Sequence, residues 1–412
     1  MRAYPPLSVK TVQSLSCKSR ERLTFLNCAS KLGKLVLFSW CLLAMSSRQL
    51  LATGSSNTGK LHFYVSSQGN DANDGSARQP WRTMQHAATA AGPGATVHVA
   101  PGSYSGQILT RSSGTAQSRI RFLSEVKWGA KLKSINAYST WRTIGNYLDI
   151  IGFDISGDGC LGILNEGAHV RLIANHVHDI PASPARCREN GGAGIDNAEF
   201  SATDNDVVGN VVHDIGDYKA TGSLVHGIYH SNSGGHIWNN VVYRTAGWGI
   251  HLWHAATDVQ IANNLLFNNA AGGILVGAGD SPGGVINDRT VVTNNIVIYN
   301  KFGIREYGRT GRENHYLNNL VYGNTAGAIQ LLTGLASRTL ELDPRFVNFQ
   351  PDGTGDYRLS ASSPAVSAGT NTAAPSEDIN GLQRSYARPH DLGPYAWSSQ
   401  SQPVSPWPPA LP

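Results

Sequence analysis

The sequence predicts an all-β protein whose chain winds into a parallel β-solenoid. A Gly-Ile phrase recurs along the chain, an asparagine phrase recurs between its copies, and the intervening apolar runs are short and rich in β-branched residues. Successive isoleucines of the first phrase lie 32, 33, 22, 24, 30 and 25 residues apart. A short period with variable insertions is typical of stacked supersecondary units. Apolar runs broken by Gly and Asn favour strands and turns over helix pairs in each unit.

Both phrases mark fixed points of each coil. The first lies at Gly162-Ile163, Gly194-Ile195, Gly227-Ile228, Gly249-Ile250, Gly273-Ile274 and Gly303-Ile304, with Ala328-Ile329 as a degenerate last copy. The second begins at Asn175, Asn210, Asn240, Asn264, Asn295 and Asn319. Asparagine amides repeated at one point of a coil can bond the same group one coil up and down, so we expect a structural ladder. His178 and His213, three residues after the first two of these asparagines, are expected to be structural or to lie at the rim.

Residues 1–54 are expected to be a leader. Eight Lys or Arg and one acidic residue fall here, so the formal net charge of +5 belongs to this segment, and the remaining 25 basic and 27 acidic residues leave the body near −2. The apolar run 35–45 follows two lysines, is too short to span a bilayer comfortably and precedes small residues, as in an exported chain. We expect a secreted or periplasmic protein with no membrane partner after leader removal and no nucleic-acid partner. A short membrane anchor is the alternative.

Two of the five cysteines, Cys160 and Cys187, lie outside this leader. They fall on adjacent units, and export favours one disulfide between them, which would fasten the insertion 181–192 to the preceding coil. Two buried free thiols are the alternative.

The chain before the repeats supplies the elements that begin the solenoid. Residues 62–65 are expected to form a first strand, and residues 69–75 a turn-rich loop that lacks the bidentate Glu of a calcium loop. Residues 80–91 are expected to form an amphipathic helix, with a proline at its start and Gly92-Pro93 after its end. The first coil of a solenoid has an open strand edge and an open core, so this helix is expected to cap it.

At these elements the sequence resembles a known superfamily. The order FYVSSQGNDANDGS, PWRTMQHAA, AGPGATVHVAPGSYSG resembles the opening of right-handed parallel β-helix proteins of the pectate-lyase-like superfamily, and the segments that begin at Asp343, Tyr357 and His390 resemble the end of its secreted members. The resemblance covers roughly residues 61–397. It implies a single-stranded right-handed parallel β-helix with an N-terminal capping helix, and polysaccharide as the substrate class. Lyases, glycosidases and epimerases share this fold, so the fold alone does not choose among them.

The expected organisation has four parts. The leader over residues 1–54 precedes a parallel β-helix with its N-terminal cap over 55–342, a C-terminal capping segment over 343–397 and a disordered tail over 398–412. The insertions 181–192 and 278–289 are expected to wall a substrate groove.

The residues that follow the phrase isoleucines are expected to form one outward row. Side chains alternate between the faces of a strand, so an inward isoleucine is followed by an outward residue, and stacking aligns these positions across the coils. The row reads Leu164, Asp196, Tyr229, His251, Leu275, Arg305 and Gln330. Trp248, Trp253, His226 and His254 flank it, and Glu306 lies beside it at a position expected to face inward. Adjacent coils are about 4.8 Å apart, so Tyr229 and His251 are expected to be neighbours.

This set of residues suits β-elimination of a uronate, which needs a cation for the carboxylate, a base for the C5 proton and an acid for the leaving oxygen. Arg305 is expected to neutralise the carboxylate. His226 or His251 is expected to be the base, and Tyr229 the acid or a shared acid and base. The substrate-binding residues are expected to be Asp196, Trp248, Trp253, His254, Glu306 and Gln330. The leading hypothesis is therefore a metal-independent, monomeric polysaccharide lyase.

Two other functions stay open. A glycoside hydrolase needs two carboxylates at a set separation, for which Asp196 and Glu306 are the candidates. A non-catalytic carbohydrate-binding or surface protein is favoured if the groove is shallow and its polar groups do not converge. No cofactor is predicted. Many lyases of this fold bind Ca²⁺, but the row has no aspartate cluster to hold it and no lysine.

Overall fold

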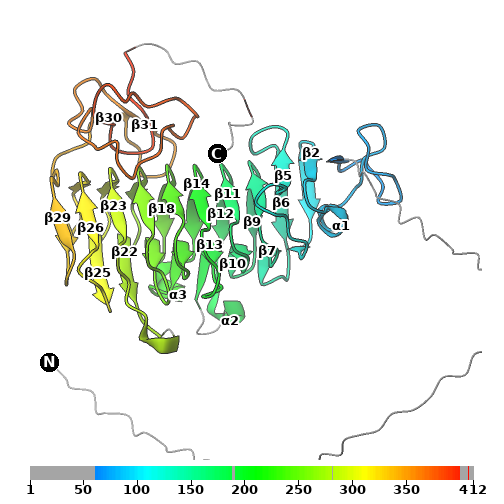
Figure 1. The fold of residues 1–412 in the computed structure, drawn as a ribbon, viewed down its shortest axis with the longest axis horizontal. Coiled ribbons are helices and arrows are strands. Elements are labelled where there is room, and N and C mark those ends of the chain that lie inside the picture. Colours follow the sequence, from blue (N-terminus) through cyan, green and yellow to red (C-terminus); the bar gives the residue numbers. More distant parts are fainter. Residues whose placement is uncertain (1–60, 188–190, 281, 400–406, 408–412) are drawn as a thin grey trace, which may run out of the picture. The chain divides into compact units, whose positions relative to one another are not determined.

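A computed structural model of the chain confirms the parallel β-helix (Figure 1). The structure describes residues 61–187, 191–280, 282–399 and 407. The expected leader, and the expected tail apart from residues 398, 399 and 407, lie outside these residues. Three long parallel sheets run along the body, and each full coil contributes one strand to each of them.

We name the three sheets by what they carry. The cavity sheet contains β4 (Ile108–Thr110), β7 (Ser139–Thr143), β10 (Leu161–Asn165), β13 (Gly192–Asn197), β16 (Val225–His230), β19 (Trp248–Leu252), β22 (Gly272–Ala278), β25 (Phe302–Gly308) and β28 (Ile329–Gln330). The ladder sheet contains β3 (Gly102–Ser105), β6 (Ala130–Ser134), β9 (Asp154–Gly157), β12 (His176–Ile180), β15 (Val211–Ile215), β18 (Val241–Thr245), β21 (Leu265–Phe267), β24 (Ile296–Ile298) and β27 (Leu320–Tyr322).

The third sheet, the long sheet, begins one strand earlier and ends one strand later than the others. It contains β1 (His62–Val65), β2 (Thr96–Val99), β5 (Ile120–Ser124), β8 (Leu148–Ile151), β11 (Arg171–Ile173), β14 (Asp206–Val208), β17 (His236–Trp238), β20 (Gln260–Ala262), β23 (Val291–Thr293), β26 (His315–Leu317) and β29 (Leu335–Ser337). The remaining elements are the antiparallel pair β30 (Phe346–Asn348) and β31 (Asp356–Leu359), and the short helices α1 (Met84–Ala90), α2 (Pro184–Cys187), α3 (Tyr218–Thr221) and η2 (Pro282–Gly284).

The helix α1 caps the first strand of the cavity sheet, as the sequence predicts. The side chain of Gln85 accepts a hydrogen bond from the backbone N–H of Leu109 at 2.7 Å and donates one to its carbonyl at 3.2 Å. Leu109 belongs to β4, so this amide satisfies backbone groups at an edge that has no further strand. The helix begins at Met84 rather than at the predicted residue 80, because Thr83 is its N-cap and accepts from the N–H of His86 at 3.2 Å.

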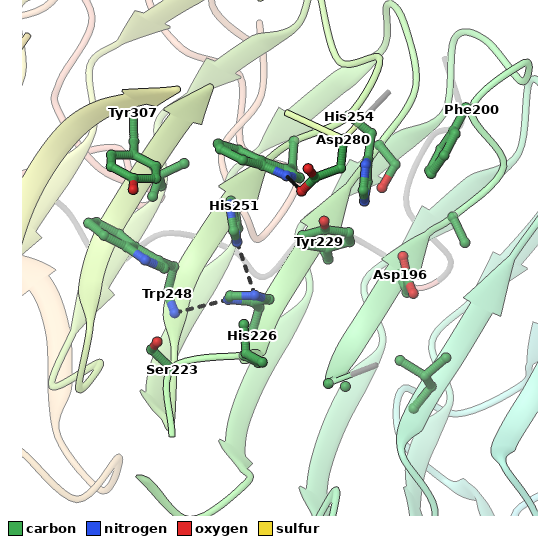
Figure 2. A pocket seen from close by; sticks show the side chains of 18 of the residues that line it. Asp196, Phe200, Ser223, His226, Tyr229, Trp248, His251, His254, Asp280 and Tyr307 are labelled. Atoms are coloured by element: carbon green, nitrogen blue, oxygen red, sulfur yellow. Dashed lines mark hydrogen bonds between the residues drawn. The ribbon is translucent and has the colours of Figure 1, made fainter. Parts of the chain in front are cut away.

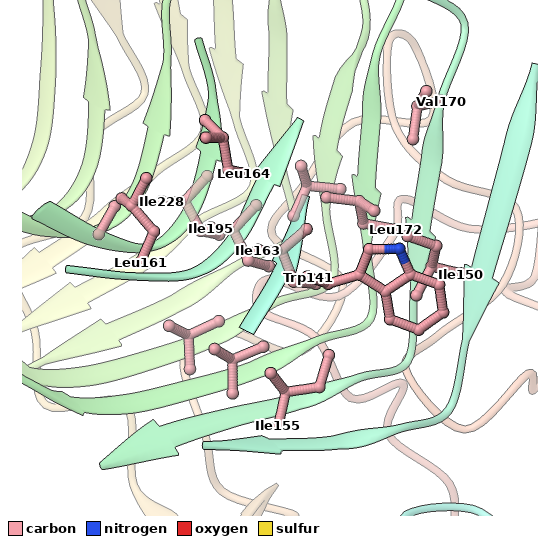
Figure 3. Close-up of a cluster of buried hydrophobic side chains, with 14 of the residues drawn as sticks. Trp141, Ile150, Ile155, Leu161, Ile163, Leu164, Val170, Leu172, Ile195 and Ile228 are labelled. Carbon is pink, nitrogen blue, oxygen red and sulfur yellow. The ribbon is translucent and has the colours of Figure 1, made fainter. Parts of the chain in front are cut away.

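The two repeated phrases meet in the interior of the β-helix. The isoleucines of the six Gly-Ile copies, from Ile163 to Ile304, pair in register from coil to coil and are at most 1% exposed; Figure 3 shows Ile163, Ile195 and Ile228 among them. The glycine before each isoleucine lies against the valine or leucine two residues after a ladder asparagine. At Gly227 an added Cβ would overlap the side chain of Val242 and lie 2.6 Å from the carbonyl oxygen of Gly249. Glycine recurs here because the backbone of one sheet packs directly on side chains of another.

The predicted asparagine ladder is confirmed on the ladder sheet. From Asn210 to Asn319, the Oδ1 of each asparagine accepts hydrogen bonds from the backbone N–H and the Nδ2 of the asparagine one coil before it, beginning with Asn175 as the first donor. A second ladder of Asn269, Asn300 and Asn324 was not predicted. Both ladders satisfy buried backbone groups at the turns between strands, so they keep the coils in register.

The C-terminal segment packs on the outer face of the ladder sheet. Tyr357 and Leu359 of β31 form one apolar cluster with Tyr243 and Phe267 of the ladder sheet. Asn263, in the turn between β20 and β21, also donates hydrogen bonds to the carbonyl oxygens of residues 391 and 393. The segment therefore covers this flank of the β-helix.

Trp407, inside the tail expected to be disordered, also contacts the body. Its indole N–H donates to the carbonyl oxygen of Ser124 at 2.8 Å, and the ring packs beside Ile151 and Ile173 of the long sheet. The expectation of disorder is wrong at this residue, because an apolar patch on the long sheet receives the indole.

The two cysteines expected to pair form a disulfide. Cys160 precedes β10 and Cys187 ends α2, with their Cα atoms 5.4 Å apart. The bond fastens the α2 insertion to the preceding coil. Within the described part of the chain, no helix has the length and apolar character needed to cross a membrane.

Replacing Asn240 by Ala should destabilise the fold strongly. Its Nδ2 donates to the Val207 carbonyl and to Asn264 Oδ1, and its Oδ1 accepts two hydrogen bonds from Asn210. The substitution leaves several buried polar groups unpaired, so we expect the free energy of unfolding to fall by about 2–4 kcal/mol in denaturant titrations. The exposed Asn348→Ala is the control and should change it by less than about 0.5 kcal/mol. Equal effects of the two substitutions would show that the ladder does not hold the coils.

Candidate active site

The outward row exists on the cavity sheet as predicted. Asp196 on β13 pairs in register with Tyr229 on β16, and Tyr229 pairs with His251 on β19. The row continues through Leu275 on β22 to Arg305 on β25 and ends at β28. Asp196, Tyr229 and His251 therefore lie side by side on three consecutive coils.

A cavity of about 640 Å³ lies over these coils (Figure 2). Seven of the ten residues predicted for catalysis or binding line it: Asp196, His226, Tyr229, Trp248, His251, Trp253 and His254. The lining also includes residues that were not predicted to act in catalysis or binding: Tyr138, Leu161, Gly191, Gly192, Ala198, Phe200, Ser223, Leu224, Ser231, Leu275, Asp280 and Tyr307. Gly191 and Gly192 end the first insertion and Asp280 lies in the second, so both insertions wall the cavity.

A chain of hydrogen bonds fixes the protons on the two histidines (Figure 2). The backbone N–H of Trp248 donates to Nδ1 of His226 at 3.2 Å, which leaves the proton of that neutral ring on Nε2. Nε2 of His226 lies 3.0 Å from Nδ1 of His251, so His226 donates and His251 accepts. His251 in turn carries its proton on Nε2, a buried atom with no hydrogen-bond partner among the described residues. His251 therefore offers an N–H group to the cavity.

These hydrogen bonds overturn the base role that was predicted for the two histidines. Burial lowers the pKa of His226 to about 3, and burial together with His226 and His254 lowers the pKa of His251 well below its usual value. Both rings are neutral at pH 7. Moving the His251 proton to Nδ1 would require His226 to accept at both nitrogens, which a neutral imidazole cannot do. His251 is thus a hydrogen-bond donor, and His226 fixes its tautomer.

Asp196 is the group in the cavity that is poised to exchange a proton. Its Oδ1 is buried and has no hydrogen-bond partner in the described part of the chain. Burial, and secondly the charge of Glu166, raises the pKa of Asp196 to about 7. A carboxyl group that titrates near neutral pH can act as a general acid or a general base, and such shifts concentrate at functional sites.

Tyr229 stands between the carboxyl group and the imidazole. Its ring stacks on His226 with centroids 5.2 Å apart and meets His251 edge-on at 5.0 Å. Burial, and secondly the charge of Asp196, raises the pKa of Tyr229. The phenol is therefore protonated throughout the neutral range, as a proton donor must be.

Aromatic side chains form the walls of the cavity. Trp253 stacks on Tyr307 with centroids 5.9 Å apart, and Phe200 stacks on His254 at 4.3 Å. The indole of Trp253 lies against Gly279 of the next coil, where an added Cβ would overlap it. Glycine on the neighbouring coil makes room for this wall.

Asp280 is a second carboxylate of the cavity that sequence reasoning missed. It accepts a long hydrogen bond of 3.4 Å from the indole of Trp253. It lies in the insertion 278–289, which was expected to wall the groove, but nothing in the repeat pattern fixes the direction of a side chain within an insertion.

Arg305 and Gln330 do not line the cavity, which corrects their predicted roles. Leu275 separates Arg305 from His251 in the row, which places Arg305 about 10 Å away. The guanidinium instead lies over the rings of Phe302 at 4.6 Å and Tyr307 at 5.4 Å. Gln330 is one coil further and donates to the carbonyl oxygen of Ala326. The long side chain of Arg305 packs on neighbouring aromatic rings rather than reaching along the row.

The assignment of Glu306 to substrate binding is wrong. Its side chain points into the β-helix and is 2% exposed. It accepts hydrogen bonds from the Tyr316 hydroxyl at 2.9 Å, from the Asn314 amide, and from three successive backbone N–H groups of residues 332–334. The Glu306 carboxylate thus satisfies buried hydrogen-bond donors at the C-terminal end of the β-helix. Among the described residues, one group has the spacing of metal ligands, Asp154, His176 and His178, and it lies on the ladder sheet.

Comparisons with known proteins agree with the fold. A family model described as a protein of unknown function (DUF1565) matches residues 67–110, and no curated protein matches the chain. Among solved structures, the pectate lyase Pel9A is similar with 17% identity and a TM-score of 0.55, over 82% of this chain and 96% of its own. XylC in complex with xylose has 11% identity and a TM-score of 0.49, over 70% and 71% of the two chains. An alginate lyase from Paenibacillus sp. str. FPU-7 has 17% identity and a TM-score of 0.45, over 61% and 95%.

These likenesses concern the fold. The similarity to the pectate lyase over most of both chains confirms the right-handed parallel β-helix that the sequence predicts. At such identity the reaction has to be argued from the cavity itself.

The buried neutral His226 should make the fold less stable in acid. Its pKa is about 3 in the folded chain and about 6.5 when unfolded, so between these values the unfolded chain binds the extra proton and stability falls as the pH falls. Between pH 7 and pH 4.5, urea titrations should show a loss in free energy of unfolding that is about 2 kcal/mol larger for the wild type than for His226→Gln. Equal losses in the two proteins would contradict a neutral, buried His226.

Proposed function

We propose that this chain cleaves a uronate-containing polysaccharide by β-elimination in the cavity of the cavity sheet. The observation that carries this proposal is the consecutive placement of Asp196, Tyr229 and His251 in one register row. β-Elimination needs a base, an acid and a donor to the carboxyl group of the sugar, and the row offers one side chain for each. The likeness of fold to a pectate lyase supports the substrate class.

Asp196 is assigned the base. In its ionised form it takes the C5 proton of the uronate, while the C4–O bond breaks and a C4–C5 double bond forms. Its raised pKa, which results from burial and secondly from the charge of Glu166, makes it a stronger base than an ordinary carboxylate. About half of it is ionised at pH 7, and the ionised share increases above that pH.

Tyr229 is assigned the acid and His251 the donor to the uronate carboxyl group. The phenol gives its proton to the departing C4 oxygen and then regains a proton from solvent, into which Asp196 releases the one it took. The Nε2–H of His251, oriented by His226, stabilises the negative charge that develops on the carboxyl group as the C5 proton leaves. These assignments replace Arg305 and the histidine base of the sequence hypothesis.

The aromatic walls of the cavity suit a carbohydrate ligand, and the disulfide suits a protein outside the cell. The rings of Trp253 and Tyr307 line the cavity, and the apolar faces of sugar rings can pack on them. Secretion is part of the proposal, and the disulfide between Cys160 and Cys187 supports it, because such bonds persist in oxidising compartments.

Glycoside hydrolysis is the second candidate, and Asp280 favours it. With Asp196 as an acid of raised pKa and Asp280 as the other carboxylate, two carboxyl groups line the cavity, which is the number that hydrolysis requires. Asp280 takes the place that the sequence hypothesis gave to Glu306.

The purified chain should be assayed on alginate, pectate, hyaluronan, chondroitin and glucuronan. Elimination yields products with the ultraviolet absorbance of a conjugated unsaturated uronate, whereas hydrolysis yields reducing ends without it. Asp196→Asn and Tyr229→Phe should each lower kcat/KM by about 10²–10⁴-fold on the polymer that is cleaved. Arg305→Ala and Gln330→Ala are matched controls, since both residues belong to the same row but lie outside the cavity, and they should keep most of the activity. Full activity of Asp196→Asn and Tyr229→Phe would refute the site.

The pH profile separates the two reactions. If Asp196 acts as the base of an elimination, kcat/KM should rise as the pH increases through about 7. If Asp196 is the acid of a hydrolase, kcat/KM should fall over the same range. A profile without an inflection near this pH would exclude Asp196 from proton transfer.

A further inference from the structure

The ladder sheet carries a second group of reactive side chains, away from the cavity. Asp154 on β9 and His176 and His178 on β12 each offer a ligand atom, and these atoms lie within 4.8 Å of one another. His213 on β15 joins them, with its Nε2 2.7 Å from Nε2 of His176. We call these four residues the histidine cluster. It spans three consecutive coils, as the active row does on its own sheet.

Two outer carboxylates orient the rings of the cluster. Nδ1 of His178 donates to Asp179 at 2.9 Å, and Nδ1 of His213 donates to Asp214 at 2.6 Å. A carboxylate on one nitrogen of an imidazole fixes the tautomer that leaves a lone pair on the other, which is the usual outer arrangement around a metal-binding histidine. Both Nε2 atoms therefore present lone pairs toward the interior of the cluster.

The interior of the cluster holds more lone pairs than donors. Nδ1 of His176 donates to Asp154 at 3.0 Å, so Nε2 of His176 also carries a lone pair, directed at Nε2 of His213. Nε2 of His178 lies 3.2 Å from the other oxygen of Asp154, which is also a hydrogen-bond acceptor. Acceptor atoms that face one another at these distances repel unless a proton or a metal ion lies between them.

We propose that the histidine cluster binds one divalent transition-metal ion, with Zn²⁺ as the reference metal. Imidazole and carboxylate are ligands that suit Zn²⁺, whose bonds to nitrogen and oxygen are about 2.0–2.2 Å. In a tetrahedral site with such bonds, neighbouring ligand atoms are roughly 3.3 Å apart. The 3.2 Å from Nε2 of His178 to Oδ1 of Asp154 is close to that value, and Nε2 of His176 lies 2.7 Å from Nε2 of His213.

Solvent can reach the histidine cluster, and aromatic rings flank it. The side chains of its histidines are 14–21% exposed and that of Asp154 is 16% exposed, so an ion has a path from solvent. Trp128 stacks on His176 at 4.8 Å, and Tyr243 stacks on His213 at 4.7 Å. Since the ligands come from β9, β12 and β15, a bound ion would cross-link three coils. The site stands apart from the catalytic cavity and does not depend on the proposed reaction.

Metal binding should be measured on the untagged full chain after removal of metal with a chelator. Titration calorimetry with Zn²⁺, and metal analysis after gel filtration, should show one ion per chain, and the melting temperature should rise when Zn²⁺ is added. Asp154→Asn and His178→Gln should each weaken binding at least ~10-fold and lose the melting shift. His236→Gln is the control, because His236 on the long sheet also pairs with an aspartate, at 2.8 Å, but belongs to no group of three ligands. Cleavage of polysaccharide should be the same in His178→Gln as in the wild type.

The proposal fails if the wild type retains no more Zn²⁺ than Asp154→Asn and His178→Gln, or if His236→Gln loses the ion equally. The first outcome would mean that the cluster holds a proton instead of a metal. Should the two variants not fold by circular dichroism, the wild type loaded with Co²⁺ decides. Intense visible bands of tetrahedral Co²⁺ are expected, and the weak spectrum of the hydrated ion would refute the site.

Discussion

The registration of each coil on the next is the constraint on which the rest of the structure depends. The stacked phrase isoleucines and the asparagine ladders fix it from inside, through burial and through satisfied buried amides. A slip of one residue would turn every outward side chain inward. Because the register is fixed, residues as far apart in sequence as Asp196 and His251 become neighbours on the surface, separated only by Tyr229. The same constraint gathers the histidine cluster on the ladder sheet.

The cavity combines this rigid support with unpaired polar atoms. A buried Oδ1 on Asp196 and a buried Nε2–H on His251 have no partners, and each costs stability that the ladders and the core must offset. Such groups are retained where a ligand or a reacting atom will pair with them. The backbone N–H of Trp248 determines the tautomer of His226 and, through it, that of His251. A main-chain group of one coil thus sets the chemistry offered by a side chain.

The fold and the row could be predicted from the sequence, because a strand repeat encodes both the stacking and the alternation of faces. Features that depend on side-chain length, on the backbone or on insertions could not. Arg305 was expected to reach along the row, but nearby aromatic rings hold it. The tautomer of His251 depends on a backbone N–H, and Asp280 depends on the course of an insertion. His178 was expected to be structural or to lie at the rim, because the repeat pattern does not show that Asp154 lies beside it.

The central claim is that Asp196, Tyr229 and His251 act together on a sugar held in one cavity. A crystal structure of Asp196→Asn with an oligosaccharide of the polymer that the wild type cleaves tests this claim most directly. The account predicts a sugar ring against Trp248 or Trp253, with a sugar carboxyl oxygen within hydrogen-bond distance of Nε2 of His251 and the scissile oxygen beside the hydroxyl of Tyr229. An oligosaccharide bound on another face, or in the cavity without contact to His251 and Tyr229, would contradict it.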